Sequence, residues 1–390
     1  MGLVKIDNFF IVLKMKFLII THVPHLKYEN HYFAYSPYVN EMNIWAKYAT
    51  ELIVVAPLTF SDKSAIDSSY IHPKIKFLSI DNFDVLSLKG LFRTVIKTPK
   101  ISWQIFRAMR SANHIHLRCP GNIGLLGCLV QIAFPSKPKT AKYAGNWDPK
   151  SQQPWTYKLQ KWILSNTFLS RNMTVLVYGE WQGSTKNIKP FFTATYSEAE
   201  KTPILNKTLQ QTIDFVFVGA LVSGKNPLYA IQLVQRLFQK GYKVKLTLYG
   251  DGKERKNLEH YCYANQLDGI VILKGNQNKA ALKKAYQESH FVILPSKSEG
   301  WPKAIAEGMF WGCVPIATPV SCVPYMLDKK NRGILLNMNF EQDILQIETV
   351  VNNQQVFDKK QILAANWSRN YTLEVFENEI KKMLLQSYRS

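Results

Sequence analysis

Short apolar runs alternate with longer amphipathic segments along most of the chain. The runs are four to six residues long, which is typical of strands buried on both faces of a parallel sheet. Between them, apolar residues recur every three or four positions, which predicts helices, for example over 227–240 and 279–289. The expected strands are 17–21, 52–56, 75–80, 114–117, 140–143, 174–178, 214–218, 245–249, 269–273, 291–294 and 314–317.

This alternation of strands and helices predicts an α/β protein built from two Rossmann-like domains. The alternation pauses over 179–211, a polar stretch rich in Lys, Thr, Asn and Pro. We therefore expect an N-terminal domain over 1–195 and a C-terminal domain over 210–370, followed by a helix over 371–390.

The composition excludes several other classes of protein. Of the 390 residues, 46% are hydrophobic and 20% are charged, an ordinary globular mixture. The five cysteines show no C-x-x-C spacing and are interpreted as reduced thiols, neither a disulfide framework nor a zinc site. No Asp-x-Asp and no His, Cys or Asp cluster with ligand spacing occurs, so we expect neither a metal nor a cofactor.

The charge is unusual, with 49 basic and 28 acidic residues and a net charge of +21. Between Asp84 and Asp148 there are ten basic residues and no acidic one. Such an excess predicts an anionic partner: nucleic acid, anionic lipid or a phosphorylated substrate. The sequence lacks RNP-like, helix-turn-helix and zinc motifs, so we expect no nucleic acid and assign the charge to an anionic membrane surface.

The segment 86–110 interleaves apolar and aromatic residues with cations and contains no acid. This pattern predicts an interfacial helix pair interrupted at Pro99. The alternative is that its apolar stripe packs on the first sheet while the cations are solvated.

No run is long enough to span a bilayer. The most apolar N-terminal run, 9–20, is interrupted by Lys14 and Lys16 and lacks a small-residue cleavage site. Met15 opens a stretch that is normal for the start of an α/β domain, which makes it a candidate translation start. We expect a cytoplasmic protein, peripheral at the inner face of the cell membrane.

The sharpest chemical signal follows the expected strand 291–294. The chain continues through Pro-Ser-Lys-Ser to Glu299, and Gly300 and Pro302 fit a tight turn before a helix that begins near Pro302 or Lys303. Free N–H groups and the helix dipole at such a site favour phosphate. Glu299 and Glu307 supply carboxylates, which suit sugar hydroxyls because they accept charge-assisted hydrogen bonds.

In this context, Glu299-x7-Glu307 resembles the signature of retaining GT-B glycosyltransferases of family 4. Two further segments agree in order and spacing. "FVFVGALVSGKNP" resembles the loop that begins at Gly219 and whose lysine, Lys225, holds the donor diphosphate. "LTLYGDGKERKNLE" resembles a Gly-x-Gly turn, for which a purely structural role is the alternative. The resemblance is strong over 214–336.

The resemblance implies a GT-B fold with a donor/acceptor cleft between the domains and a C-terminal helix that packs back on the first domain. It also implies a metal-independent, retaining hexosyltransferase that uses a nucleotide-sugar as substrate. The acceptor would be a glycan or a lipid-linked sugar, as in surface polysaccharide or glycolipid assembly.

The same resemblance assigns the donor residues. Lys225 would contact the diphosphate and Glu307 the ribose, while Glu299 would contact the hydroxyls of the transferred sugar. Backbone groups of Gly300, Trp301, Pro302 and Lys303 would surround that sugar. Simple packing under the helix is the alternative for Trp301.

The sequence also departs from the family pattern. Ala220 stands where an Arg is common, and Lys303 or Arg255 are candidates to replace its charge. The usual glycine pair after the first strand is replaced by an aromatic, histidine-rich loop, which we expect to shape the acceptor pocket.

"SANHIHLRCPGNIGLLG" resembles the strand end that places a histidine near the transferred sugar. One register assigns that position to His116, and the other assigns it to Arg118. A structural histidine is the alternative reading of His116.

Two other functions compete with transfer. The first is a catalytically inactive GT-B subunit that binds the donor or a partner protein. It would explain why Ala220 stands where an Arg is common. A nucleotide-sugar epimerase of GT-B type would lack the pairing of the lysine loop with Glu-x7-Glu.

Overall fold

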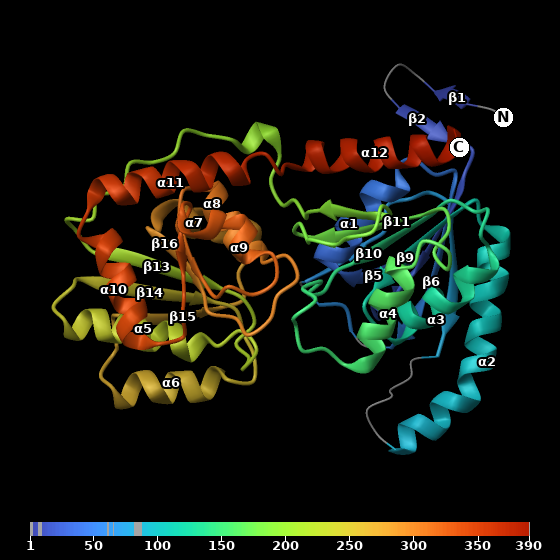
Figure 1. Ribbon diagram of the computed structural model, residues 1–390. Coiled ribbons are helices and arrows are strands. Elements are labelled where there is room, and N and C mark those ends of the chain that lie inside the picture. Colours follow the sequence, from blue (N-terminus) through green and yellow to red (C-terminus); the bar gives the residue numbers. More distant parts are fainter. Residues whose placement is uncertain (1–2, 7–9, 61, 65, 82–87, 390) are drawn as a thin grey trace. The chain divides into compact units, whose positions relative to one another are not determined.

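Two separate sheets organise the chain, which this computed structural model describes over residues 3–6, 10–60, 62–64, 66–81 and 88–389 (Figure 1). Unit 1 comprises Met1–Phe191 with Glu377–Ser390, and unit 2 comprises Phe192–Phe376. The compact units therefore divide between Phe191 and Phe192, inside the polar stretch. The domain limits expected at 195 and 210 remain predictions.

Unit 1 is built on a large, mostly parallel sheet. Its strands follow the order β12-β11-β10-β9-β3-β6-β4-β5-β7, and β8 also pairs with β6. The parallel strands are β3 (Lys16–Ile20), β6 (Glu51–Thr59), β8 (Ile75–Ile80), β9 (His114–Cys119), β10 (Lys139–Tyr143), β11 (Met173–Tyr178) and β12 (Ile188–Phe191).

Three short strands extend this sheet: β4 (His25–Tyr28), β5 (His31–Tyr35) and β7 (Asp67–Ser69). β5 pairs antiparallel with both β4 and β7. β1 (Leu3–Ile6) and β2 (Phe10–Leu13) form a separate antiparallel pair. The helices of this unit are α1 (Ser36–Ala46), α2 (Leu88–Ser111), α3 (Asn122–Val130), continued by the short η2 (Gln131–Ala133), and α4 (Trp155–Ser165).

The C-terminal helix α12 (Leu373–Arg389) returns to unit 1 from Glu377 onward. Glu377 accepts hydrogen bonds from Lys47 Nζ at 2.7 Å and from Tyr48 Oη at 3.1 Å. Glu379 pairs with Lys189 at 2.8 Å. The expected packing of the last helix on the first domain is thus present.

Unit 2 has a six-stranded parallel sheet in the order β15-β14-β13-β16-β17-β18. The strands are β13 (Ile213–Val218), β14 (Val244–Tyr249), β15 (Val271–Gly275), β16 (Phe291–Leu294), β17 (Val314–Ala317) and β18 (Ile334–Leu335). The helices are α5 (Pro227–Gln239), α6 (Arg255–Ala264), α7 (Lys279–Glu288), α8 (Lys303–Phe310), α9 (Val323–Met326), α10 (Phe340–Val351) and α11 (Gln354–Ser368). Short 3-10 turns are η3 (Glu198–Glu200) and η4 (Asp328–Lys330).

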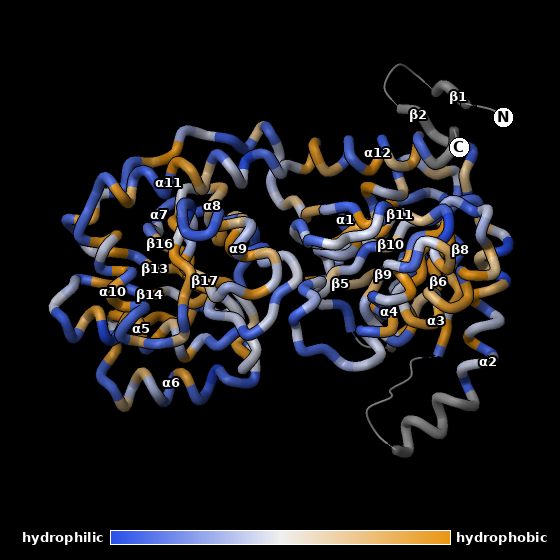
Figure 2. The backbone as a smooth tube through the Cα atoms, in the orientation of Figure 1, coloured by the Kyte–Doolittle hydropathy of each residue, from blue (hydrophilic) through white to orange (hydrophobic). Residues whose placement is uncertain are grey.

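The strands supply the apolar interior of each unit, and Figure 2 shows the hydrophobic colour concentrated on them. β16 and β17 are buried along their whole length, as parallel strands covered on both faces must be. Every strand expected from the sequence is present, with its ends shifted by at most three residues. The α/β class and the two Rossmann-like halves are confirmed.

Each sheet has one point at which the strand order reverses. In unit 1 the chain leaves β3 toward β6 and β8, then returns to β9 on the other side of β3 and continues outward to β12. In unit 2 it leaves β13 toward β14 and β15, then returns to β16. Ligands of open α/β sheets bind at the carboxyl ends of strands beside such a reversal. The loops after β3, β9, β13 and β16 are therefore where binding chemistry is expected.

The interruption expected at Pro99 is wrong, because α2 runs through Pro99 as one helix. Ile101, Ile105 and Met109 are fully buried in the core of unit 1, so this part of the apolar stripe packs on the sheet. Residues 86 and 87 and the side chains of 88–96 lie outside the described residues.

Candidate functional site

The lysine loop follows β13 and ends at the first turn of α5. The backbone N–H of Lys225 donates to the Val222 carbonyl at 2.9 Å, which closes a turn. Asn226 then takes a left-handed conformation with φ 52°, and Pro227 starts the helix, where its missing N–H costs nothing. Gly219 stands at the carboxyl end of the strand. This local geometry holds Lys225 at the edge of the sheet.

The loop after β16 meets the lysine loop. Lys225 Nζ lies 2.5 Å from Glu299 Oε1, with side chains 31% and 7% exposed. The Lys297 backbone N–H donates to the Gly224 carbonyl at 2.9 Å, and Lys297 Nζ donates to Ser223 Oγ at 3.1 Å. Two motifs that are 74 positions apart thus form one charged cluster at the reversal point of the sheet.

The Gly-x-Gly pair lies behind the lysine loop. A Cβ added to Gly250, whose φ is +141°, would meet the Gly219 carbonyl oxygen at 1.9 Å. One added to Gly252 would meet the Leu221 carbonyl oxygen at 2.4 Å. The Leu221 N–H also donates to the Asp251 carbonyl at 2.9 Å. These contacts give the pair a packing role, the structural alternative named above.

α8 begins at Lys303, with Pro302 as its N-cap residue. A hydrogen bond stabilises the turn before this helix, because the Gly300 carbonyl accepts from Ser321 Oγ at 3.1 Å. Trp301 is buried, with its ring 6.0 Å from that of Trp367 and 5.5 Å from that of Tyr371. Its indole therefore packs against α11 and the turn that follows it.

Glu307 lies in the second turn of α8 and is half-buried. Its carboxylate accepts hydrogen bonds from Thr195 Oγ1 at 2.8 Å and from Tyr286 Oη at 3.2 Å. Burial raises the pKa of this carboxyl, and the Thr195 hydrogen bond and the nearby Lys303 charge oppose the shift. A carboxylate has about four acceptor positions, so two remain for a ligand.

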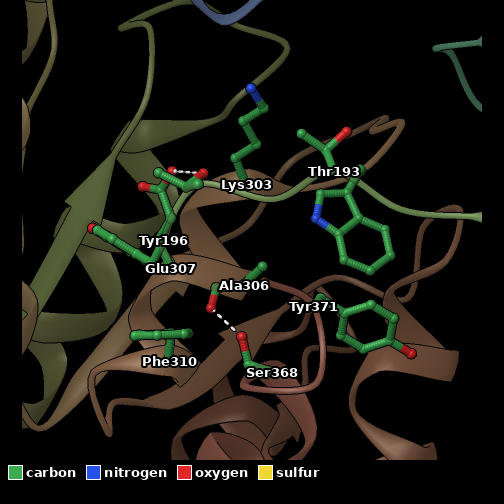
Figure 3. A pocket seen from close by; sticks show the side chains of 10 residues that line it. Thr193, Tyr196, Lys303, Ala306, Glu307, Phe310, Ser368 and Tyr371 are labelled. Atoms are coloured by element: carbon green, nitrogen blue, oxygen red, sulfur yellow. Dashed lines mark hydrogen bonds between the residues drawn. The ribbon is translucent and has the colours of Figure 1, made fainter. Parts of the chain in front are cut away.

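A cavity of about 10 Å³ lies beside Glu307 (Figure 3). Figure 3 shows Tyr196 and Phe310 on the side of Glu307 and Tyr371 on the opposite side, with Ser368 donating to the Ala306 carbonyl. Such a volume holds about one water molecule and no nucleotide. This cavity alone is therefore too small to enclose a nucleotide-sugar.

In unit 1, the two histidines of β9 lie inside the core. His114 Nε2 and His116 Nδ1 both contact Thr140 Oγ1, at 3.0 and 2.9 Å. The His116 ring packs against Trp45 at 4.7 Å. Burial lowers the pKa of His114 to about 3 and that of His116 further below its usual value. Both residues fit the structural reading of a core histidine, although within the described part of the chain the second ring nitrogen of each, His114 Nδ1 and His116 Nε2, has no hydrogen-bond partner.

Arg118 projects from the same face of β9, nearer its carboxyl end. Its Nη1 lies 2.8 Å from Glu41 Oε1, and Lys142 Nζ lies 2.9 Å from the same oxygen. The side chains of Arg118, Glu41 and Lys142 are 12%, 5% and 1% exposed. Burial is the largest influence on Arg118 and opposes its charge, but Glu41, Tyr178 and Tyr38 together raise the pKa of the guanidinium. Burial lowers the pKa of Lys142.

The loop after β3 adds an exposed histidine to this reversal point. A Cβ on Gly121, which has φ +155°, would lie 2.6 Å from His22 Nδ1, so the glycine lets the β9 loop approach the β3 loop. Behind it, His25 Nε2 lies 2.9 Å from Tyr70 Oη, which donates to Tyr38 Oη at 3.2 Å. The aromatic, histidine-rich loop thus lies beside Arg118.

Three charged residues at these points were missed by sequence reasoning: Glu41, Lys142 and Lys297. Glu41 is separated from Arg118 by 77 positions, and no spacing rule connects them. A usable signal was that Glu41 is an acid within α1, whose other residues are all uncharged. Lys297 lies in the quoted motif, but only the fold brings it to Ser223.

Within the described ranges, no group of three or more His, Cys, Asp or Glu side chains is placed to hold a metal ion. Metal independence remains a prediction. None of the described helices is both long and apolar enough to cross a membrane.

Comparisons with known proteins complete the picture of the site. Residues 201–370 match the family described as Glycosyl transferases group 1. An uncharacterized glycosyltransferase of Haemophilus influenzae is 27% identical over 171 residues, which cover 43% of this chain and 47% of that protein. Protein CapJ of Staphylococcus aureus is 24% identical over 396 residues, covering 95% of each chain. The chain thus spans about half of the first relative and nearly all of the second.

Among solved structures, Anabaena Alr3699/HepE in complex with UDP is similar with a TM-score of 0.67 and 14% identity. The similarity covers 96% of this chain and 100% of that one. At this identity it supports the fold alone, and the expected GT-B fold is confirmed.

Proposed function

We propose a function from the premise that, over residues 201–370, the chain belongs to the glycosyl transferases of group 1. In this proposal, it moves a sugar from a nucleotide-sugar to an acceptor hydroxyl with retention at the anomeric carbon. Neither a metal ion nor a cofactor takes part. The acceptor is a glycan or a lipid-linked sugar in surface polysaccharide or glycolipid assembly, at the cytoplasmic face of the cell membrane.

One observation carries this proposal: the contact between Lys225 and Glu299. Both side chains come from loops at the reversal point of the unit 2 sheet, where α/β proteins bind nucleotides. A carboxylate that accepts from sugar hydroxyls therefore lies directly beside a cation that can hold a diphosphate. The Lys225 side chain is 31% exposed, so it remains accessible to a ligand.

The charges that develop during transfer explain the roles of these groups. When the anomeric C–O bond breaks, negative charge grows on the leaving diphosphate and positive charge on the sugar ring. Lys225 and the N-terminus of α8 stabilise the diphosphate charge, and Glu299 orients the sugar by its hydroxyls. The acceptor hydroxyl attacks from the same face, and the leaving diphosphate oxygen takes its proton.

Lys297 supplies the positive charge that Ala220 lacks. Arg255, one candidate for this role, pairs with Asp251 at 3.2 Å and with Glu259 at 2.8 Å, so two acids already neutralise it. Lys303 stands at the start of α8, four residues before Glu307, and lines the small cavity. Lys297 is hydrogen-bonded to the lysine loop itself, which favours it over both.

On the acceptor side, Arg118 is the residue that acts, and His116 is structural. His116 is fully buried against Trp45, whereas Arg118 reaches the carboxyl end of β9. Glu307 fixes the ribose with the acceptor positions that Thr195 and Tyr286 leave open.

The test is a panel of nucleotide-sugars read by thermal shift, followed by donor hydrolysis with and without EDTA. UDP-sugars come first, because the similar Anabaena protein was solved with UDP. We expect one donor to stabilise the protein and to be hydrolysed slowly in the presence of EDTA. NMR should show that the anomeric configuration of the product, α or β, is the same as that of the donor. Binding without hydrolysis or transfer would identify an inactive donor-binding subunit, and inversion would exclude the mechanism.

A further inference from the structure

Unit 1 exposes an unusual set of large aromatic side chains. Phe168, Trp155, Trp103 and Trp162 are 85%, 72%, 61% and 59% exposed. Tryptophan is highly buried on average in soluble proteins, and contiguous exposed apolar side chains mark interaction sites. Leu129 and Ile132 are exposed as well. We call these six residues the aromatic face.

The six residues come from elements that pack against one another. α3 contacts both α2 and α4, and the three helices are neighbours in Figure 1. At the end of α3, Gln131 Nε2 donates to the Leu169 carbonyl at 3.0 Å. This bond ties Ile132 to the turn that carries Phe168.

The aromatic rings continue this contact onto α2. The rings of Trp103 and Phe106 stack with centroids 5.6 Å apart, and Phe106 lies 5.0 Å from Phe134. On α4, Trp155, Lys158 and Trp162 are exposed at spacings of three and seven, which places them along one side of the helix. The aromatic face is therefore one surface of the helix layer.

The charge on the segments that carry the aromatic face is mostly positive. Between Asp84 and Glu180 the chain has fourteen Lys and Arg residues and a single acid, Asp148. Asp148 accepts a hydrogen bond from the backbone N–H of Lys150 at 2.8 Å. Exposed cations on the same elements are Lys100, Arg107, Arg110, Lys158 and Arg171.

We propose that the aromatic face binds the surface of an anionic lipid bilayer, with Trp155, Trp162 and Phe168 at the headgroup–acyl boundary. Tryptophan prefers this interface because its ring is apolar and its N–H is polar. Each nearby Lys or Arg adds to the attraction toward an anionic surface. The inference gives the membrane location proposed above a specific surface, but it does not depend on sugar transfer.

The charge argues against the other occupants of such a face. A symmetric dimer through the aromatic face would bring two cationic surfaces together, which is unfavourable. The centres of protein–protein interfaces are depleted in lysine. An anionic bilayer matches both the cations and the aromatic side chains.

The experiment measures sedimentation of the full chain with phosphatidylcholine vesicles, with or without phosphatidylglycerol. The test variants are Trp155→Ala/Trp162→Ala/Phe168→Ala and Lys158→Glu/Arg171→Glu. The control is Tyr263→Ala/Leu345→Ala in unit 2, where these side chains are 76% and 62% exposed. We expect the wild type to bind only the anionic vesicles, and this binding to weaken with salt. Both test variants should lose about tenfold or more in vesicle affinity, and the control should lose none.

Brominated lipids add a readout of depth. They should quench the tryptophan fluorescence of the wild type and of the control but not of the aromatic triple variant. Nucleotide affinity should be the same in all four proteins, which shows that the variants fold and separates this test from that of sugar transfer. Equal binding to neutral vesicles, full binding by the triple variant, or a self-association that the triple variant abolishes would overturn the proposal.

Discussion

The two units have the same kind of parallel sheet but treat charge at its reversal point in opposite ways. In unit 1, one carboxylate, Glu41, pairs with both Arg118 and Lys142 in the interior. In unit 2, the pair of Lys225 and Glu299 keeps its lysine half-exposed at the sheet edge. Glu41 and Lys142, which are 5% and 1% exposed, mainly affect stability, whereas Lys225 still reaches solvent and is available to a ligand. The comparison therefore predicts which substitutions lower the stability of the protein and which lower its catalytic activity.

The largest effect is expected at Glu41. Glu41→Gln removes the carboxylate that pairs with two buried cations, which costs about 3–5 kcal/mol of unfolding free energy in unit 1. The measurement is hydrogen exchange of β9 and β10 in the full chain, compared with β13 and β14. The matched control is Glu377→Gln, which removes the more exposed ion pair to Lys47 and should cost about 1 kcal/mol or less. Equal losses in the two variants would mean that the buried cluster has no special role.

Lys225→Gln tests the opposite behaviour in unit 2. Since the leaving charge grows toward the transition state, we expect kcat to fall about 10²–10³-fold while nucleoside affinity is kept. The control is Lys240→Gln, which removes a similar ion pair to Glu348, at 2.7 Å, away from the reversal point. A parallel loss of nucleoside affinity and turnover would make Lys225 a structural residue.

Much of this architecture could be predicted from the sequence, because buried parallel strands are continuous apolar runs. The motif around Glu299 was also visible, since its turn, helix start and carboxylates are close in sequence. β4, β5 and β7 were not predicted, because their polar and aromatic residues, such as those of His31–Tyr35, give no long apolar run. The Glu41 cluster was invisible because its three members come from α1, β9 and β10 and meet only after folding.

Glu307→Ala tests binding without turnover. It removes the carboxylate proposed to fix the ribose, and a lost hydrogen bond to a charged group costs about 1.5–3 kcal/mol, so calorimetric nucleotide affinity should fall accordingly. Glu348→Ala, on α10 of the same unit, should bind nucleotide like the wild type. If Glu307→Ala retains full affinity in a folded protein, the ribose assignment is wrong, and the hydrogen bonds from Thr195 and Tyr286 are the whole role of this carboxylate.

The smallest effect, taken per pH unit, concerns His25, and it distinguishes the two units by their response to pH. Burial lowers the pKa of His25 from 6.5 to about 4, so the folded unit 1 binds fewer protons than the unfolded chain between these values. Its contribution to stability is therefore complete above pH 6.5 and is lost as the pH falls toward about 4. Across this window the unfolding free energy of unit 1 should fall by about 1 kcal/mol more per pH unit in the wild type than in His25→Phe. Hydrogen exchange of β4 and β6 measures this difference, and the strands of unit 2 serve as the internal control, where the two proteins should agree. Identical pH slopes in unit 1 would show that the ring between Tyr70 and Phe77 takes up its proton at the same pH in the folded protein as in the unfolded chain, contrary to its burial.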